Sequence, residues 1–276
     1  MNIGIVGLGL MGGSLGLALK EFPKKYKIIG YDHNKKHQVE AIELNLIDKL
    51  ATNFNEIKSC DVIVLCIPVD AIIKATKTLK DIHNECTIID FGSSKEKIDA
   101  SIPKEIRQNF VTAHPMTGTE KFGPTAAIYE LYTNKVMVIC NQEKSAKLQK
   151  NRALEIFSDI KAKVVFMGAE EHDRDAAFIS HMPHAVSYAI ANSVMKQENP
   201  QSIIALAGGG FKSMSRIAKS SPNMWEDIFR QNKTNLLESI DSFNQEMKIC
   251  QSFIENEQWD ELHSWMSDAN RLHDIL

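Results

Sequence analysis

Two side chains in this sequence have the type and position for proton and anion chemistry. His114 directly follows an apolar, strand-like stretch, residues 110–113. A histidine fixed at a strand end can take a proton from an alcohol as hydride leaves the adjacent carbon. Arg216 lies in the helical segment that the glycine triplet 208–210 opens, where a guanidinium can bind a carboxylate through two hydrogen bonds. A structural histidine and a surface arginine are the alternatives that these two residues leave open.

A dinucleotide site is indicated at the start of the chain. An apolar run, residues 2–6, leads directly into Gly7-x-Gly9-x-x-Gly12 and an apolar helical stretch. Gly7 permits the tight turn, and Gly9 lets a pyrophosphate approach the backbone closely. Gly12 lets the helix pack on the strand, while the helix N-terminus attracts phosphate. The glycine motif therefore predicts a strand–turn–helix unit that holds a dinucleotide.

An acidic residue twenty positions later predicts which dinucleotide binds. Residues 27–31 are typical of a second strand, and Asp32 stands at its carboxyl end. A carboxylate there accepts hydrogen bonds from ribose hydroxyls and repels a 2′-phosphate, which favours NAD over NADP. His33, Lys35 and Lys36 follow closely, so the strictness of this preference stays open. The predicted cofactor-binding residues are Gly7, Leu8, Gly9, Leu10, Met11, Gly12, Asp32 and Pro68.

A histidine pair stands out in the second half of the chain. His181 and His184 are three residues apart, so they share one face of a predicted helix. Pro183 within that helix removes a backbone donor, a cost accepted near a functional cleft or where a kink improves packing. The sequence offers no obvious further ligands nearby, so we predict no metal site.

The elements that position these residues fall into two kinds. Strand-like runs alternate with helical stretches in the first half, at residues 2–6, 27–31, 61–67, 86–90, 110–113, 136–139 and 164–166. Continuous apolar strands of this kind predict a parallel sheet buried on both faces, with ligands at the carboxyl ends of its strands. From about Ala169 the apolar residues recur every three or four positions, and residues 225–253 predict a long helix with one buried stripe. We therefore predict an α/β Rossmann-type domain at residues 1–168, followed by an all-α substrate and dimerisation domain at residues 169–276.

Composition excludes several classes of partner. The 276 residues carry a net charge of −3 with both signs mixed, which predicts neither a nucleic-acid nor a membrane partner. Met1 leads directly into the first strand, and the five cysteines are scattered, so we expect no signal peptide and a cytoplasmic protein with reduced thiols. Apolar helices in so small a domain predict a homodimer, with a monomeric bundle as the alternative.

Four motifs together resemble one enzyme family over nearly the whole chain. The chain resembles the prephenate dehydrogenases of tyrosine biosynthesis, the TyrA-type enzymes. The shared motifs are Gly92-Ser93-Ser94-Lys95, His114-Pro115-Met116-x-Gly118-x-Glu120, Ser180-His181-x-Pro183-His184 and Gly208-Gly-Gly-Phe-Lys212 through Arg216-Ile-Ala218. Their order and spacing identify the family far more specifically than the amino-terminal glycines do.

The resemblance implies an NAD-dependent oxidative decarboxylation of prephenate to 4-hydroxyphenylpyruvate. It gives His114 the role of the catalytic base that accepts the 4-hydroxyl proton, and Ser93 that of the catalytic serine that orients this histidine. The residues that match the family's substrate pocket are Arg216, His184, Thr119, Glu120 and Trp225. Ser213 stands where the family has an aspartate, so Glu120 is left as the acidic residue that gates the pocket or pairs with Arg216.

Other functions stay open at the level of sequence. Arogenate dehydrogenase differs from the prephenate enzyme only in the substrate's amino-bearing side chain. A β-hydroxyacid dehydrogenase would need a catalytic lysine, and Lys212 is the candidate. Here His114 fills the role of the proton acceptor instead. A non-catalytic NAD-binding sensor is the alternative of another class. Tyrosine feedback and a contribution of partner residues to the site also stay open.

Overall fold

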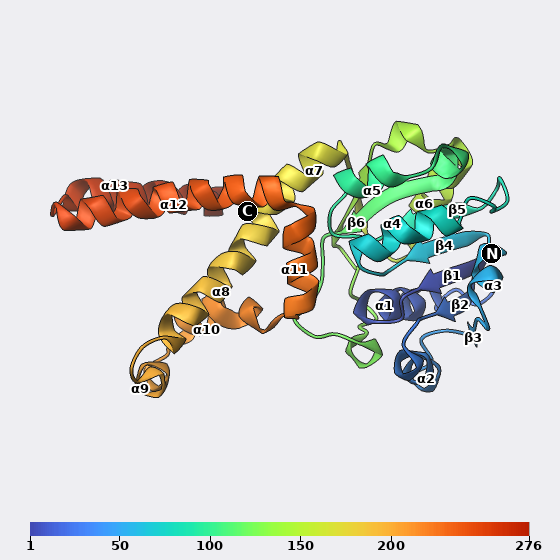
Figure 1. Cartoon of the computed structure of the whole chain (residues 1–276), viewed down its shortest axis with the longest axis horizontal. Coiled ribbons are helices and arrows are strands. Elements are labelled where there is room, and N and C mark those ends of the chain that lie inside the picture. The colour runs from blue at the N-terminus through green and yellow to red at the C-terminus, as the bar shows by residue number, and fades with distance from the viewer. Residues whose placement is uncertain (276) are drawn as a thin grey trace.

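The computed structural model describes residues 1–275 and divides into a sheet domain and a helical domain. Figure 1 shows the sheet at one end, with two helical arms extending from it and diverging. This order of elements confirms the predicted fold class.

An eight-stranded sheet forms the body of the first domain. Its strands are β1 (Asn2–Val6), β2 (Lys27–Tyr31), β3 (Lys49–Leu50), β4 (Val62–Leu65), β5 (Thr87–Asp90), β6 (Phe110–Pro115), β7 (Val136–Cys140) and β8 (Lys163–Met167). They are ordered β3-β2-β1-β4-β5-β6-β7-β8. The order reverses direction between β1 and β4, which is where ligands bind in sheets of this kind.

Helices cover both faces of this sheet, as the apolar strands require. They are α1 (Leu10–Leu19), α2 (Lys35–Glu43), α3 (Phe54–Lys58), α4 (Val69–Thr78), α5 (Glu96–Ser101) and α6 (Lys147–Asp159). Buried side chains of α1 and α6, such as Leu15 and Ile156, belong to one core cluster. Those of α4 and α5, such as Ile72 and Ile98, belong to the other.

The prediction of a wholly parallel sheet is wrong at β7, which runs antiparallel to β6. Residues 116–135 join these two strands with only a short 3₁₀ turn, Pro124–Ala126. A parallel return needs a crossover, usually through a helix, and this connection supplies none. The next connection contains α6, and β8 accordingly pairs parallel with β7. β8 is also largely exposed instead of buried on both faces.

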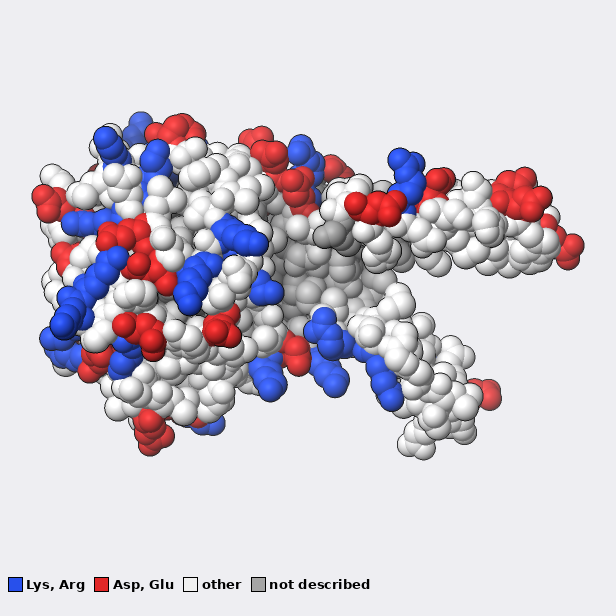
Figure 2. All heavy atoms as spheres, turned by 180° about the vertical axis from the view of Figure 1, so that it is seen from behind, with Lys and Arg blue, Asp and Glu red and all other residues white. Residues whose placement is uncertain are grey.

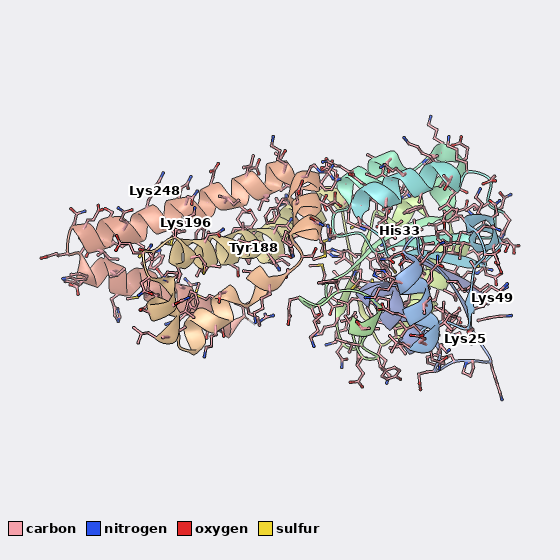
Figure 3. The ribbon with its side chains drawn as sticks, turned by 60° about the horizontal axis from the view of Figure 1, so that its bottom comes forward. Lys25, His33, Lys49, Tyr188, Lys196 and Lys248 are labelled. Atoms are coloured by element: carbon pink, nitrogen blue, oxygen red, sulfur yellow. The ribbon has the colours of Figure 1, made fainter. Side chains whose placement is uncertain are left out.

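Helices make up the rest of the chain. They are α7 (Ala169–Ala176), a π turn (Ala177–His181), α8 (Met182–Met195), α9 (Pro200–Ala205), α10 (Gly209–Ser215), a 3₁₀ turn (Arg216–Lys219), α11 (Pro222–Gln231), α12 (Lys233–Glu255) and α13 (Trp259–Asn270). The π turn lies just before Pro183, which cannot donate the usual backbone hydrogen bond. In Figure 3, Tyr188 marks α8, and its hydroxyl donates to the Ser220 carbonyl at 3.0 Å.

The prediction of one long helix over residues 225–253 is also wrong, because the chain breaks at Asn232 between α11 and α12. The Asn232 amide donates to the carbonyl of Asp173 at 2.6 Å and lies 3.1 Å from Nδ1 of His181. These buried contacts hold Asn232 outside helical geometry, with φ −111° and ψ 37°. Much of the predicted stripe is exposed in the single chain, as at Leu237 and Met247.

Both arms expose apolar side chains. Leu206 beyond α9, Met195 on α8 and Trp259 on α13 are 87%, 60% and 57% exposed. Figure 2 shows charges of both signs intermixed over the sheet domain and long uncharged stretches on the arms. Across residues 1–275, no helix combines the length and apolar character that crossing a membrane requires.

Candidate active site

The glycine loop between β1 and α1 has the shape of a phosphate cradle. Gly7 has a φ of +90°, and a Cβ on it would lie 2.3 Å from the carbonyl oxygen of Cys66. Nothing lies within 4 Å of the Cβ position of Gly9, which leaves the loop open for close approach. Gly9 also caps α1, so the free N–H groups of that helix face the same space.

The acid at the end of β2 closes the other side of this loop. Asp32 is 5% exposed, and its carboxylate accepts the backbone N–H groups of Leu8 and Asn34, both at 2.8 Å. A carboxylate offers about four acceptor positions, so acceptor capacity is left for ribose hydroxyls. Pro68, which caps α4 after the neighbouring β4, is exposed at the same edge of the sheet.

We expect Gly12→Ala to weaken NAD⁺ binding about 10- to 100-fold, or roughly 1.4–2.7 kcal/mol. A Cβ at this position would lie 1.9 Å from the Gly7 carbonyl oxygen, so α1 or the loop must shift. Titration of protein fluorescence with NAD⁺ measures the effect. Gly118→Ala is the matched control, because its Cβ has nothing within 4 Å. Unchanged affinity in Gly12→Ala would contradict the predicted cradle.

The sheet brings His114 and Ser93 to the same edge as the glycine loop. His114 is the fifth residue of β6, and Ser93 follows the neighbouring strand β5. These strands run parallel to β4 and β1, so their carboxyl ends share one edge. Both side chains are half-buried. Among the described residues, no hydrogen bond joins Ser93 to His114.

Instead, His114 contacts the first helix of the helical domain. Its Nδ1 lies 2.8 Å from Nε2 of His172, and Nδ1 of His172 lies 2.8 Å from Oδ1 of Asp173. The Asp173 carboxylate also accepts the backbone N–H groups of Lys95 at 2.7 Å and Glu96 at 3.0 Å. A continuous buried chain of polar groups therefore leads from His114 across the two domains.

A buried ion pair supports the same segment. Lys95 and Asp90 are both 0% exposed and are hydrogen-bonded to each other. The Lys95 ammonium also donates to the Ala113 carbonyl at 2.7 Å, one residue before His114. The Asp90 carboxylate accepts the N–H of Gly92 at 3.1 Å, beside Ser93. This pair thus connects the strand that carries His114 with the turn that carries Ser93.

Burial controls the protonation of the two central groups. It is the main reason that the pKa of His114 lies well below its ordinary value, and the nearby His172 and Lys95 act in the same direction. Burial alone would raise the pKa of Asp173, but hydrogen bonds from His172 and from backbone N–H groups outweigh it and hold that pKa low. At neutral pH, His114 is therefore neutral and Asp173 is ionised.

The helical domain contributes an aromatic wall. The rings of His184 and Trp225 are stacked, with centroids 3.4 Å apart and planes inclined by 22°. His184 Nδ1 donates to the Ser180 carbonyl at 2.9 Å, which leaves its Nε2 free of that bond. Burial lowers the pKa of His184, and the Arg216 charge adds to that effect. His181 is buried and faces the same Trp225 ring edge-on at 6.1 Å.

A cation and an acid from different domains meet at the mouth of this region. Arg216 Nη1 lies 3.8 Å from Oε2 of Glu120, and the arginine side chain is 62% exposed. Glu120 belongs to the connection between β6 and β7, together with the half-buried Thr119. Glu120 and Arg216 thus form an ion pair between the two domains, and the role of Glu120 in the pocket stays a prediction. The guanidinium keeps free donors for an anionic ligand.

Sequence reasoning missed His172, Asp173 and Asn232. The signal available for His172 and Asp173 was that a histidine and an aspartate are adjacent at the start of the helical domain, and neither belongs to a recognised motif. Asn232 carried only the weaker signal of a polar residue inside an apolar stripe. None of the three could be linked to His114 without knowing how the two domains pack.

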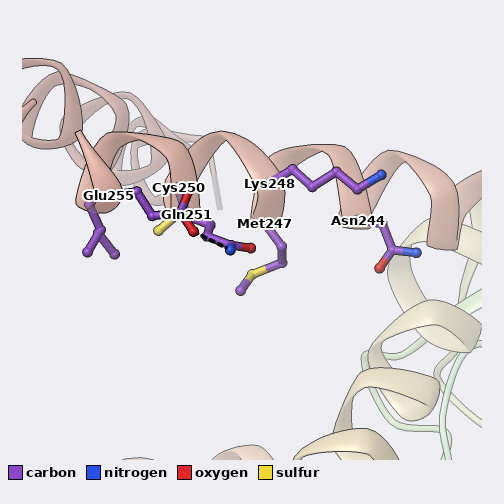
Figure 4. Close-up of a pocket in the computed structure, with 7 residues that line it drawn as sticks. Asn244, Met247, Lys248, Cys250, Gln251 and Glu255 are labelled. Carbon is purple, nitrogen blue, oxygen red and sulfur yellow. Dashed lines mark hydrogen bonds between the residues drawn. The ribbon is translucent and has the colours of Figure 1, made fainter.

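Two further features lie outside this region. Figure 4 shows a hollow on α12, lined by Asn244, Met247, Lys248, Cys250, Gln251, Ile254 and Glu255. It lies on an arm and holds none of the predicted site residues. No cluster of three or more His, Cys, Asp or Glu side chains suited to a metal ion occurs in residues 1–275.

Comparison with protein families gives two matches that follow one another along the chain. The family model described as prephenate dehydrogenase, nucleotide-binding domain, matches residues 15–166. The one described as prephenate dehydrogenase, dimerization domain, matches residues 168–268. A prephenate dehydrogenase of Bacillus subtilis (strain 168) is 32% identical over 280 residues, covering 99% of this chain and 75% of the relative.

Solved structures agree with this comparison. A prephenate dehydrogenase from A. aeolicus, in complex with hydroxyphenyl propionate and NAD⁺, superposes with a TM-score of 0.92 at 32% identity. That match covers 100% of this chain and 98% of the other. A Synechocystis arogenate dehydrogenase gives a TM-score of 0.83 at 26% identity, over 100% and 99% of the two chains.

Proposed function

The chain belongs to the prephenate dehydrogenase family, and from this premise we propose that it oxidises and decarboxylates prephenate with NAD⁺ to give 4-hydroxyphenylpyruvate. It is thus an NAD-dependent oxidoreductase of tyrosine biosynthesis. The observation that carries the proposal is the junction of two domains at one sheet edge. The half-buried proton acceptor His114 contacts His172 of the helical domain, and the exposed carboxylate-binding group Arg216 contacts Glu120 of the sheet domain.

The glycine loop and Asp32 fit NAD⁺. The loop is open at Gly9, where a pyrophosphate needs close approach, and α1 presents its N–H groups there. Asp32 favours ribose hydroxyls over a 2′-phosphate. When bound, NAD⁺ supplies the acceptor for the hydride that leaves C4 of the substrate. The loop, with Leu8, Leu10, Met11 and Pro68 around it, would hold the cofactor at the edge where His114 lies.

His114 accepts the proton of the substrate's 4-hydroxyl as the hydride leaves. Its low pKa keeps it neutral, so it has a lone pair for that proton at working pH. Ser93, at the adjacent strand end, orients the substrate hydroxyl. Because loss of CO₂ makes the ring aromatic, the reaction is strongly downhill. The protein therefore has to supply chiefly position and proton transfer.

The carboxylates of prephenate meet the helical domain. Arg216 binds one of them, and His184 contacts the substrate in the same pocket, with Trp225 as the wall. Thr119 and Glu120 line the entrance. Prephenate is favoured over arogenate because the 32%-identical relatives carry the prephenate name, whereas the arogenate enzyme is 26% identical. The two substrates differ only in the side-chain amine, which none of these residues singles out.

The helical domain also makes the protein a homodimer. Its family model is described as a dimerization domain, and exposed apolar residues follow both arms. Leu237, Met247 and Ile254 on α12 are each about half exposed. Burying such a face against a second copy removes apolar surface from water. The predicted cytoplasmic location remains a prediction.

The experiment that tests the function is NADH formation at 340 nm with purified protein and either prephenate or arogenate. NADP⁺ is run alongside as the alternative cofactor. Turnover with prephenate and NAD⁺ supports the proposal, whereas turnover with arogenate alone changes the substrate and keeps the mechanism. Binding of NAD⁺ without turnover of either substrate would contradict it and favour the sensor alternative.

We expect Arg216→Ala to raise KM for prephenate about 10- to 150-fold, corresponding to a lost charge-assisted hydrogen bond of roughly 1.5–3 kcal/mol. The change removes ground-state binding, so kcat falls much less. Steady-state kinetics at saturating NAD⁺ give both constants. Arg216→Lys keeps the charge without the bidentate geometry, so its KM should lie between those of the wild type and Arg216→Ala. A KM equal to the wild-type value in Arg216→Ala would remove Arg216 from the pocket.

A further inference from the structure

His114, His172 and Asp173 form an unbroken hydrogen-bonded chain, and the proposed reaction uses only His114. His172 and Asp173 are each 2% exposed, and both belong to α7, at the start of the helical domain. His172 lies between Asp173 and His114, at 2.8 Å from each. We propose that His172 and Asp173 are positioning residues, which fix the His114 tautomer that presents Nε2 as proton acceptor and stabilise its imidazolium. This inference rests on the proposed function.

The direction of the chain follows from its acidic end. Asp173 is ionised, so it can only accept hydrogen bonds. Nδ1 of His172 must then carry the hydrogen between them, and in neutral His172 the lone pair lies on Nε2. That lone pair accepts from Nδ1 of His114. In neutral His114, Nε2 is left with the lone pair that a base requires.

The same chain offsets an electrostatic disadvantage. The groups around His114 are Lys95 and Asp90 from the β5–α5 segment, His172 and Asp173 on α7, and His181 in the π turn. Burial opposes a positive charge on His114, and so do the neighbouring His172, Lys95 and His181. When Nε2 takes the substrate proton, the Nδ1–H remains on the hydrogen bond to His172, and the Asp173 carboxylate lies beyond it. The imidazolium then faces the Asp173 carboxylate through the ring of His172, which stabilises it without an ion pair.

Asp173 also controls the other reacting side chain. Its two oxygens accept the backbone N–H groups of Lys95 and Glu96, at the end of the turn that carries Ser93. One carboxylate thus sets the position of Ser93 and the tautomer of His114. The adjacent carbonyl of Asp173 accepts from Asn232, which fixes α7 against α12.

The first test is His172→Phe, which keeps a buried ring and removes both nitrogens. We expect kcat to fall about 10- to 100-fold, with KM for prephenate and Kd for NAD⁺ within about threefold of wild type, since a positioned proton acceptor contributes at this scale. The variant leaves the Asp173 carboxylate in place but removes the acceptor of the hydrogen bond that the His114 imidazolium donates from Nδ1, so the acid limb of the kcat–pH profile should move to lower pH, by about 0.5–1 unit. The sign follows because a hydrogen bond donated by the charged form raises the pKa of a histidine, and its loss lowers that pKa.

Two variants separate positioning from structure. His172→Gln has an amide that can donate to Asp173 and accept from His114, so it should restore kcat to within about fivefold of wild type. His181→Phe makes the same substitution in an equally buried histidine outside the chain. The pKa of His181 is lowered by burial to about 4, and a charge on it would lower the pKa of His114, so its removal should not move the acid limb to lower pH. An unshifted limb or a wild-type kcat in His172→Phe would overturn the inference.

A measurement without substrate tests the His114 tautomer independently of the proposed reaction. In ¹⁵N-histidine-labelled protein, long-range ¹H–¹⁵N spectra identify which ring nitrogen carries the proton. We expect His114 to be protonated on Nδ1 in the wild type and to become a mixture in His172→Phe. A wild-type His114 protonated on Nε2 would overturn the inference even if the enzyme turns over prephenate. The expected spectrum with no turnover would overturn only the proposed reaction.

Discussion

His114→Asn is expected to lower kcat about 10²- to 10⁴-fold, the range typical of losing a general base. Asparagine places an amide N–H close to the position of the histidine Nδ1, so the contact with Nε2 of His172 can persist. The atom that is lost is Nε2, the proposed proton acceptor. Kd for NAD⁺ should stay within about twofold of wild type, because the glycine loop and Asp32 belong to other strands.

Initial rates at saturating substrates, together with NAD⁺ titration, measure this result. A loss of NAD⁺ affinity equal to the loss of rate would point to a damaged fold rather than a missing base. Undiminished turnover would exclude His114 as the proton acceptor and reopen a lysine-based mechanism through Lys212. Ser93→Ala is the companion variant, and we expect a smaller loss of kcat because the histidine keeps its contact with His172.

Lys95→Met is expected to destabilise the protein by about 3–5 kcal/mol, the cost of leaving one charge of a buried pair without its partner. Asp90 remains 0% exposed and would still accept only the N–H groups of Gly92 and Ala113. Burial already raises the pKa of Asp90, and loss of the ammonium raises it further, so the carboxyl takes up a proton. The Ala113 carbonyl also loses its donor. Urea unfolding followed by circular dichroism measures the change in free energy.

A double variant isolates the pair. Asp90→Asn with Lys95→Met has no buried charge, so it should recover a large part of the loss seen in Lys95→Met alone. The stability of Lys95→Met should also depend on pH in a predictable direction. A carboxyl whose folded pKa is raised costs stability above its unfolded pKa, so Lys95→Met should gain stability as the pH falls toward that of free aspartate. Equal stability of Lys95→Met and wild type would show that the pair adds nothing to folding.

Sequence was sufficient where the structural signal is local. The turn Gly7–Gly12, the acid Asp32 and the strand before His114 are each read from a few adjacent residues, because backbone conformation and strand ends impose residue types directly. The division into sheet and helix is equally local, since periodicity changes near Ala169. These features determined the fold class and the cofactor.

Sequence was insufficient where a contact between distant residues determines the structure. Nothing in the apolar run of β7 indicates that it would lie antiparallel, because direction depends on the connection that precedes it. The break at Asn232 depends on a carbonyl 59 positions earlier in the chain. The contact of His114 with His172 likewise joins residues 58 positions apart. Such pairings arise only when the two domains have packed.

The use of one carboxylate by both domains has a consequence for how this protein tolerates change. Asp173 terminates the chain to His114 and also caps the segment that follows Ser93, so it belongs to catalysis and to folding at once. A substitution at His114 is free to remove activity while the protein remains folded. A substitution at Asp173 should lower both activity and stability, since it breaks contacts between the two domains. We therefore expect few substitutions at Asp173 to be tolerated, because each would affect both activity and stability.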